Sequence, residues 1–395
     1  MSETTTIPRG GRSSVTMAAL PRRRPVLLLV GPVPPPFIGP AVATDRLIRS
    51  SVIAANFDVV HLDTTDREGM DDIGKLSLRN ISIALGHGWR CLRLVKRHRP
   101  AVVYVQIDRR LWGFIRDMQF MLVARLFRAR LLVHLRAGRF DLRHDFGWYG
   151  RAIARLGLMG VSRAIVLGRS VRDVFGTLVP QERIRIVPNG MNLDLYTYSP
   201  EELAAREKGP LRILYLGNLY RGKGAHVMLK AMETIVEVLP DARLVVAGRW
   251  LNSDFRSHCE SIVAEIGIES NVDFVGEVGV VAKRKLLATA NVLCFTPIEP
   301  EGLPWVVLEA MAASLPVVAT AQGTIPEVVV DNSTGLIVPS NDSRALAEAV
   351  LRLAREGCRE LGRRGRIRLE TLYSEPVAHQ TLVDVALECL REEET

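Results

Sequence analysis

Residues 292–312, VLCFTPIEPEGLPWVVLEAMA, contain the order of segments on which the fold of this chain depends. A short apolar run over 292–295 ends in a loop with proline and glycine, and a nearly uninterrupted apolar stretch begins near Pro304. Such a run is typical of a buried strand, and proline suits the first turn of a helix. The stretch therefore predicts a strand, a loop and a helix, which is the repeating unit of an α/β fold.

The same order recurs on both sides of this stretch. Val26–Val30 ends at Gly31 and a proline-rich loop, and Ala41–Ser51 then has a helical pattern. Strands that alternate with helices predict parallel sheets with helices on both faces. The other expected strands are 102–107, 131–135, 164–167 and 184–187 in the first half, and 211–216, 242–247, 272–275, 292–295 and 317–319 in the second.

A turn signal at Pro188-Asn189-Gly190 and a charged linker over 199–210 separate the two sets of strands. We predict an α/β fold of two Rossmann-like parallel-sheet domains that face each other across a cleft. The expected first domain is 25–198 with a C-terminal helix at about 375–395, and the second is 199–374. Ligands bind beyond the carboxyl ends of such strands, so functional motifs should follow strands directly.

Length and composition fit this division. The 395 residues exceed one ordinary core, and 48% of them are hydrophobic. Residues 1–24 are rich in Ser, Thr, Gly and Arg, which predicts a solvated basic tail. Its charges lie late and no cleavage site is obvious, so we expect no export signal. No segment reaches about 18 uninterrupted apolar residues, so none is expected to span a bilayer.

The cysteines and histidines exclude several kinds of site. The five cysteines are odd in number, widely spaced and free of a CxxC pair. This pattern indicates mostly buried thiols in a reducing cytoplasm, without a disulfide framework or a zinc site. The eight histidines show no metal-ligand spacing. We therefore expect no bound metal and no cofactor.

The charge is unevenly distributed. Residues 1–200 carry 31 Lys/Arg and 15 Asp/Glu, or +16, whereas the other 195 residues carry 21 and 28, or −7. The stretches 89–99 and 109–130 combine arginines with aromatic residues, including Trp112 and Phe120, which favours contact with an anionic membrane. An amphipathic helix with a solvated basic face is the alternative. No helix-turn-helix, zinc-finger or RNP-like pattern is present, so we expect no nucleic-acid partner.

Glu309 stands out in the apolar helix that begins near Pro304. A buried carboxylate needs a partner, and two vicinal ribose hydroxyls are a partner of the right kind. The amides at the helix start, between Gly302 and Trp305, suit a diphosphate. The alternatives are a Glu309 paired with a nearby Arg and a Glu301 on a solvated loop.

A second candidate site is the loop GNLYRGKG, residues 217–224, between an expected strand and a helix. It is close to a P-loop, GxxxxGK, but Gly224 stands where a P-loop needs Ser or Thr to hold magnesium. This weakens an NTPase assignment. Exposed turn residues are the other interpretation of Arg221 and Lys223.

Two segments of the first domain also follow strands. In PPPFIGP, residues 34–40, Gly39 allows close approach of a ligand, although a rigid proline-rich turn fits equally well. In LLVHLRAG, residues 131–138, alternation places His134 and Arg136 on one face of a strand. For His134 a hydrogen-bonded core histidine is the favoured interpretation.

Together these motifs resemble glycosyltransferase family 4. The resemblance rests on Glu301 and Glu309 with seven residues between them, and on GTIPE at 323–327 and TGLIVP at 334–339. It continues through 188–190 and 217–219 and extends over most of 26–390. It implies the GT-B fold and a retaining, metal-independent transfer of a hexosyl group from a nucleotide sugar.

The resemblance also implies residue roles. Glu301 would lie near the donor sugar, Glu309 would bind the ribose, and Lys223 would bind the donor phosphates. Asn218 stands where the family has Arg, with Arg221 as a substitute, and Arg136 stands where close relatives have a sugar-contacting His. The expected catalytic residues are Glu301, Lys223 and Arg136, and the expected donor-binding residues are Gly39, Asn218, Arg221, Lys223, Gly302, Leu303, Pro304 and Glu309.

We expect a cytoplasmic enzyme, peripheral at the inner membrane face, with a lipid-linked sugar or a growing polysaccharide as acceptor. In the family the departing phosphate is thought to help deprotonate the acceptor on the same face of the sugar, so the anomeric configuration is retained. Four alternatives remain open: a transferase for soluble small molecules, an epimerase or inverting transferase, a catalytically weakened nucleotide-sugar-binding protein, and a P-loop NTPase.

Overall fold

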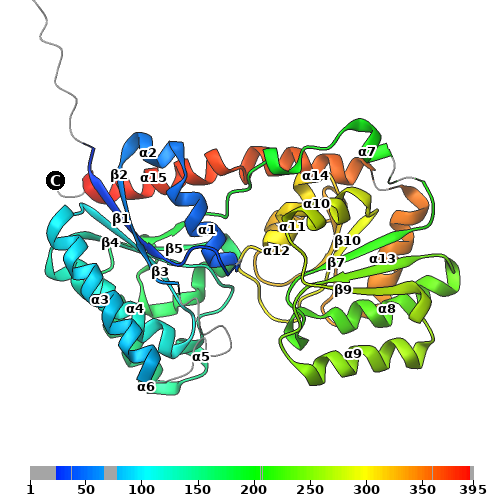
Figure 1. The fold of residues 1–395 in the computed structure, drawn as a ribbon, viewed down its shortest axis with the longest axis horizontal. Helices are drawn as coiled ribbons and strands as arrows, with labels where there is room; N and C mark the ends of the chain where they lie inside the picture. Colours follow the sequence, from blue (N-terminus) through cyan, green and yellow to red (C-terminus); the bar gives the residue numbers. More distant parts are fainter. Residues whose placement is uncertain are drawn as a thin grey trace, which may run out of the picture.

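The computed structural model describes residues 24–391 apart from 37, 66–77, 205, 207 and 358. Two lobes lie side by side, the first in blue and cyan and the second in green to orange (Figure 1). The expected tail, except for Arg24, and also Phe37 and Cys358 lie outside the described residues.

The first lobe is the amino-terminal domain. Its elements are β1 (Val26–Gly31), α1 (Gly39–Ile48), α2 (Ser51–Asn56), β2 (Asp58–Asp63), α3 (Leu78–His98), β3 (Val102–Ile107), α4 (Leu111–Leu126), β4 (Arg130–Leu135), α5 (Asp141–His144), α6 (Gly147–Leu158), β5 (Arg163–Val166), the 3-10 helices η2 (Arg169–Leu178) and η3 (Gln181–Arg183), and β6 (Ile184–Ile186).

The second lobe follows the short helix η4 (Asp194–Tyr196). Its elements are α7 (Pro200–Ala204), β7 (Arg212–Leu216), η6 (Arg221–Lys223), α8 (Ala225–Val238), β8 (Arg243–Ala247), α9 (Ser253–Ile266), η7 (Glu269–Asn271), β9 (Val272–Gly276), α10 (Val280–Thr289), β10 (Val292–Phe295), α11 (Trp305–Ala312), β11 (Val317–Thr320), α12 (Ile325–Val328), β12 (Gly335–Val338), α13 (Ser343–Glu356) and α14 (Arg359–Leu372). The last helix, α15 (Glu375–Arg391), lies beside the first lobe (Figure 1).

Both sheets are parallel, and each has six strands within the described residues. The orders are β2-β1-β3-β4-β5-β6 and β12-β11-β10-β7-β8-β9. The second order is that of a dinucleotide-binding Rossmann sheet. The predicted α/β fold with two Rossmann-like domains is confirmed.

The two strands that the sequence analysis did not identify are β2 and β12. Each lies at the edge of its sheet. The β2 sequence, DVVHLD, is only partly buried and has charged residues at both ends, so it lacks the apolar run of a central strand. An edge strand buries less surface, which makes its sequence harder to distinguish from a loop.

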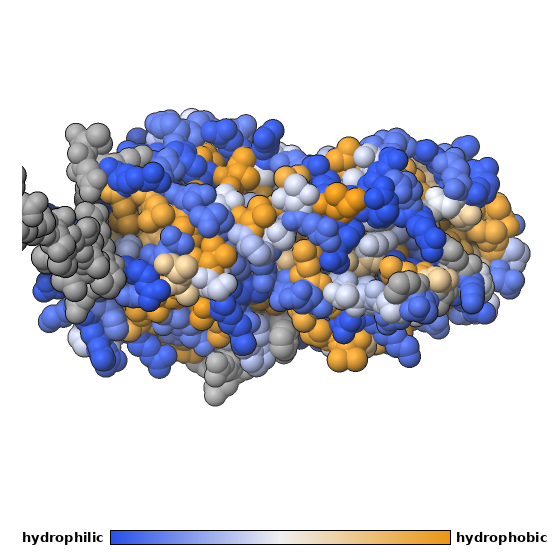
Figure 2. All heavy atoms as spheres, turned by 90° about the horizontal axis from the view of Figure 1, so that it is seen from above, coloured by the Kyte–Doolittle hydropathy of each residue, from blue (hydrophilic) through white to orange (hydrophobic). Residues whose placement is uncertain are grey.

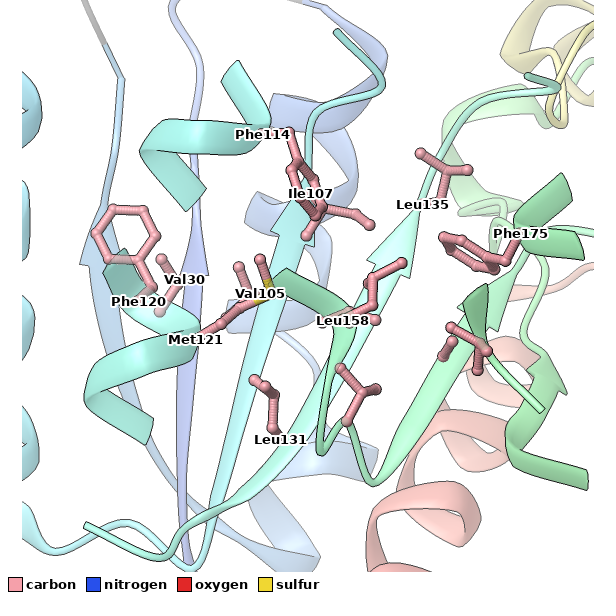
Figure 3. Close-up of a cluster of buried hydrophobic side chains, with 14 of the residues drawn as sticks. Val30, Val105, Ile107, Phe114, Phe120, Met121, Leu131, Leu135, Leu158 and Phe175 are labelled. Carbon is pink, nitrogen blue, oxygen red and sulfur yellow. The ribbon is translucent and has the colours of Figure 1, made fainter. Parts of the chain in front are cut away.

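Apolar side chains fill the space between the first sheet and the helices α3, α4 and α6. Met121 of α4 lies beside Val105 of β3, Phe114 lies beside Ile107, and Phe120 lies near Val30 of β1 (Figure 3). Each large side chain that is fully buried in this way contributes roughly 1.5–3 kcal/mol. Phe120 is 0% exposed, so its assignment to a membrane-facing position is wrong, whereas Trp112 is 44% exposed. Packing on the sheet decides which side of α4 faces water.

The chain crosses between the lobes twice, and the two crossings lie side by side. Met191 on the first crossing donates its N–H to the Tyr373 carbonyl, and the Glu375 N–H donates to the Met191 carbonyl. A Cβ on Gly190 would lie 2.8 Å from the Glu375 Cα, so this close approach requires glycine. After the second crossing, α15 buries Leu382, Val383 and other apolar residues against the first sheet.

Candidate active site

The second sheet has a switch point between its neighbouring strands β7 and β10. The chain leaves β7 toward α8, which packs on one face of the sheet, and leaves β10 toward α11, which packs on the other. The two loops therefore diverge and leave room between them for a ligand. Both loops carry the motifs found in the sequence.

Gly224 explains why the loop after β7 is not a P-loop. It has φ +75° and forms the N-cap of α8. A Cβ at this position would lie 1.8 Å from the Thr296 carbonyl oxygen. Ser or Thr cannot be accommodated there without displacing the neighbouring backbone, so the hydroxyl that holds magnesium in a P-loop has no place.

Lys223 and Glu301 meet across the two loops. The Lys223 Nζ lies 2.5 Å from the Glu301 Oε1, and the two side chains are 20% and 15% exposed. The Tyr215 hydroxyl donates to the Lys223 carbonyl at 2.5 Å, which holds the backbone of the lysine. The pair places one cation and one carboxylate at the mouth of the switch point.

Glu309 lies deeper, on α11, and is 5% exposed. Its Oε1 lies 2.5 Å from the Nζ of Lys283 on α10. Its Oε2 is buried and makes no hydrogen bond of standard geometry in the described part of the chain. The Tyr196 hydroxyl lies near this carboxylate, and burial, followed by the charge of Glu309 and a hydrogen bond to it, raises the pKa of Tyr196. The carboxylate is therefore paired by a lysine, whereas the sequence suggested an arginine as the alternative partner.

The backbone of residues 301–303 is fixed by three contacts to its carbonyls. The Thr324 N–H donates to Glu301 at 3.3 Å, the Thr324 hydroxyl donates to Gly302, and the Asn189 Nδ2 donates to Leu303 at 2.7 Å. Pro304 has no N–H, so it cannot be one of the expected amide donors; it caps α11 by accepting from Val307. The amide donors that remain at the start of α11 belong to the residues next to Pro304.

Arg136 follows β4 and links the two domains through Asn189. Its Nη1 donates to the Asn189 Oδ1 at 2.5 Å, and its Nη2 donates to the Tyr104 hydroxyl at 3.1 Å. The same hydroxyl contacts the Nδ1 of His134 at 2.8 Å. His134 is 0% exposed, and burial, followed by the Arg136 charge, holds its pKa well below the usual range. It is a neutral core histidine.

Gly39 lies against the second domain at the start of α1. A Cβ there would lie 3.2 Å from the Cδ1 and Nε1 of Trp305, the first residue of α11. The Arg46 guanidinium lies 4.5 Å from the centre of the Trp305 ring. Gly39 thus sits beside the helix that carries Glu309, where any side chain would press on Trp305.

Two expected donor-binding residues are not in this cluster. Asn218 and Arg221 are exposed. The charge of Arg221 influences the pKa values of His226 and Cys259, so it lies toward α8 and α9. No described contact joins Arg221 to Lys223 or Glu301, and its role as a substitute for the missing arginine stays a prediction.

A family model described as glycosyl transferases group 1 matches residues 201–368. These residues include both loops, Lys223 and the two glutamates. Residues 201–368 are therefore similar to the group 1 glycosyl transferases.

Curated relatives match about half of the chain. A phosphatidyl-myo-inositol mannosyltransferase of Mycobacterium leprae is 30% identical over 209 residues, which are 53% of this chain and 51% of that protein. A GDP-mannose-dependent α-(1-6)-phosphatidylinositol monomannoside mannosyltransferase of Mycolicibacterium smegmatis is 26% identical over 223 residues, covering 52% and 58%. The chain spans about half the length of the curated relatives it matches.

Solved structures resemble the whole fold. Sucrose-phosphate synthase of Thermosynechococcus elongatus has a TM-score of 0.75 at 19% identity, covering 93% of this chain and 100% of that one. HepE of Anabaena, in complex with UDP and glucose, has a TM-score of 0.72 at 15% identity, covering 92% and 100%. The GT-B fold and the resemblance to family 4 are confirmed.

The second domain is tied to the first domain by Glu327. Its carboxylate accepts the N–H of Arg169 at 2.8 Å and the N–H and hydroxyl of Ser170, both at 2.5 Å. A Cβ on Gly168 would lie 2.7 Å from the Thr324 Cγ2, so the domains touch closely here. Glu327 supplies the free amides at the start of η2 with an anionic acceptor.

Three residues of this arrangement received no role from the sequence. Lys283 lies on α10, and nothing in the sequence around it points to Glu309. Asn189 and Glu327 occur within quoted motifs, but each has a partner in the other domain. Such partners are visible only once the two domains are in contact.

Proposed function

We propose that the chain is a retaining glycosyltransferase that moves a hexosyl group from a nucleotide sugar to an acceptor. The observation that carries the proposal is the pair of Lys223 and Glu301, 2.5 Å apart at the switch point of the second sheet. A donor diphosphate that enters there meets the ammonium group, and the donor sugar meets the carboxylate. The diphosphate of such a donor needs a cation, and the hydroxyl groups of its sugar need a hydrogen-bond acceptor.

The position of Glu309 favours binding of a nucleoside at the inner end of the site. The Glu309 Oε2, which makes no hydrogen bond of standard geometry among the described residues, can accept one from a ribose hydroxyl, while Lys283 compensates the charge of the carboxylate. A buried carboxylate with a free lone pair is costly unless a ligand satisfies it. We assign Glu309 to the vicinal diol of the ribose.

The proposed mechanism is electrostatic. Cleavage of the anomeric bond leaves the electron pair on the departing phosphate oxygen, and the sugar acquires oxocarbenium character. Lys223 and the amides at the start of α11 stabilise the phosphate charge, and Glu301 orients the sugar. The departing phosphate then receives the acceptor proton as the acceptor oxygen bonds to the same face of the sugar, which preserves the anomeric configuration.

This assignment needs no metal ion. Among the described residues, no three His, Cys, Asp or Glu side chains are placed to hold one. We expect glycosyl transfer to persist in EDTA, measured by release of the nucleotide diphosphate. Loss of activity that manganese or magnesium restores would refute metal independence.

The donor can be identified by binding. A ligand that binds only the folded state raises the melting temperature, so UDP, GDP and ADP sugars can be compared directly. Two curated relatives are described as GDP-mannose-dependent. A nucleotide sugar that stabilises the chain, combined with retention of anomeric configuration seen by NMR, is the expected result; an inverted product would contradict the proposed mechanism.

We further propose an acceptor at the inner membrane face. The helices α3, α4 and α6 pack side by side on one face of the first sheet. They expose Trp89, Trp112 and Trp148 at 59%, 44% and 82%, together with Leu122 and Leu126 at 63% and 72%. Lys96 and Arg97 at the end of α3 add positive charge. This combination suits an anionic bilayer.

Other features bear on this membrane proposal. Figure 2 shows the side of the molecule that carries α14 and α15, not the side of α3, α4 and α6, and there polar residues alternate with separate apolar patches. No helix in the described ranges is long and apolar enough to cross a membrane. Several curated relatives are described as acting on phosphatidylinositol derivatives.

Vesicle co-sedimentation tests the membrane contact. We expect binding to phosphatidylglycerol vesicles at low salt, weaker binding at high salt as charges are screened, and little binding to neutral vesicles. Trp148→Ser should reduce it, whereas Trp250→Ser, which alters a partly buried ring of the second domain, should not. No binding to either vesicle would favour a soluble acceptor.

A further inference from the structure

A second cavity, of about 350 Å³, lies in the first domain. It is lined by the loops that follow β1, β2, β3 and β4. This is the switch point of the first sheet, because β1 leads to α1 on one face and β3 leads to α4 on the other. A cavity of this size accommodates a small polar molecule.

The charge of this cavity is strongly positive. Its lining contains four arginines and a single carboxylate, Asp108. Asp108 pairs with Arg110 at 3.3 Å, and the guanidinium of Arg116 is paired with Asp117 on α4 at 2.8 Å. Of the other two arginines, Arg109 has a longer ion pair, with Asp141 at 3.6 Å, and Arg136 has none among the described residues.

Arg109 donates no side-chain hydrogen bond in the described part of the chain. The nearest carboxylate oxygen is that of Asp141, at 3.6 Å from the Nε. The side chain is 39% exposed. Its guanidinium is therefore available to a ligand, and guanidinium binds phosphate oxygens through two parallel hydrogen bonds.

Arg136 carries an uncompensated charge. Its two Nη atoms donate to neutral groups, Asn189 and Tyr104, and its Nε is buried without a partner. No described carboxylate lies within ion-pair distance of it. A buried cation with an unsatisfied donor is costly, so an anionic ligand in the cavity would stabilise it.

The cavity also lies close to the donor loops. Ala137 lines the cavity, and a Cβ on the next residue, Gly138, would lie 2.5 Å from the Glu301 carbonyl oxygen. Burial and the charges of Glu301 and Glu299 raise the pKa of Tyr220 to about 12, and the charge of Arg109 opposes this rise. Tyr220 is in the loop that carries Lys223. Arg109 thus stands across the cleft from the proposed donor phosphates, on the acceptor side.

We propose that this cavity binds the phosphate group of a phosphorylated acceptor, held by Arg109 and Arg136. This inference rests on the proposed function, because it names the class of the acceptor. The phosphate can belong to a soluble sugar or polyol phosphate or to the head group of a lipid; both present the same anionic oxygens.

The test uses the full chain and inorganic phosphate as the first probe. The melting temperature is measured against phosphate concentration at constant ionic strength, with chloride as the reference and with saturating UDP, or whichever nucleotide binds, in the donor site. We expect Arg109→Gln to weaken the phosphate response at least about fivefold and Arg109→Lys to restore part of it, because one guanidinium–phosphate contact is lost and then partly replaced.

Arg139→Gln is the matched control. Arg139 also approaches Asp141 at 3.6 Å and its side chain is 41% exposed, but it does not line the cavity. Its replacement should leave the phosphate response unchanged. An equal response in wild type and Arg109→Gln, or complete loss of the response when nucleotide is bound, would overturn the proposal.

Two organic probes distinguish the sources of phosphate. Glycerol 1-phosphate represents a soluble monoester, and short-chain phosphatidylglycerol represents a lipid diester. The probe whose binding depends on Arg109 identifies the acceptor class, and binding of neither overturns the acceptor assignment. If no nucleotide binds the chain at all, the proposed function fails, whereas an Arg109-dependent phosphate response would persist.

Discussion

Replacement of Glu309 by glutamine removes one negative charge from α11 and keeps the volume of the side chain. In the structure this residue is 5% exposed, its Oε1 is bound to Lys283, and its Oε2 makes no hydrogen bond of standard geometry among the described residues. If Oε2 accepts from the ribose, the contact is a hydrogen bond to a charged group, worth about 1.5–3 kcal/mol. At about 1.4 kcal/mol for each factor of ten, its loss weakens binding roughly 10- to 150-fold.

A neutral amide still accepts a weaker hydrogen bond, so we expect Glu309→Gln at the lower end of this range and Glu309→Ala at the upper end. Titration calorimetry with the nucleotide that binds wild type best gives the dissociation constants. Glu348→Gln, on the exposed face of α13, is the matched control and should bind as wild type does.

The variant must be shown to fold. The Lys283 side chain is 25% exposed, so it can be hydrated when its partner is lost, and the cost should stay below the roughly 3–5 kcal/mol of a broken fully buried pair. A folded Glu309→Gln protein whose nucleotide affinity differs less than about twofold from wild type would refute the ribose assignment, since about 0.4 kcal/mol is too little for such a contact.

Further changes should have distinct effects. Lys223→Ala should lower kcat by about 10²–10³ with a smaller change in donor affinity, as for the loss of one preorganised donor to a developing charge; steady-state kinetics would contradict this if only KM changed. Glu327→Gln should loosen the contact with η2 and raise the donor KM about tenfold, given about 1.5 kcal/mol for one charged hydrogen bond; an unchanged KM and an unchanged small-angle scattering profile would exclude such a role. A hydrogen bond from Arg185 lowers the pKa of Glu388 to about 2 from an ordinary 4.5, so its stabilising effect is present above pH 4.5 and is lost as pH falls toward 2. Glu388→Gln should therefore unfold more easily than wild type at pH 7 but not at pH 2, and a pH-independent difference in acid and urea unfolding curves would count against this.

Local patterns predicted much of the fold and part of the site. The apolar runs of the central strands and the glycine- and proline-containing loops after them were sufficient to predict two parallel sheets. They also indicated that Lys223 and Glu301 follow strands, and strands that are neighbours in a parallel sheet bring such loops together. The edge strand β2 escaped because its sequence lacks a continuous apolar run, whereas β12, GLIV, is apolar and mostly buried and was interpreted only as part of the TGLIVP motif.

The amino-acid sequence alone determined the fold class and the residue types at the carboxyl ends of β7 and β10, because strand and helix formation depend on neighbouring residues. Tertiary structure alone decided that Lys283 compensates Glu309, that Phe120 is in the core and that Arg109 faces the cleft. The sequence of α4 is apolar on nearly all sides, so its own periodicity could not say which side packs on the sheet. Partners from distant segments, and the face that each helix turns to water, follow from how the two domains pack, and that packing depends on contacts that no local stretch contains.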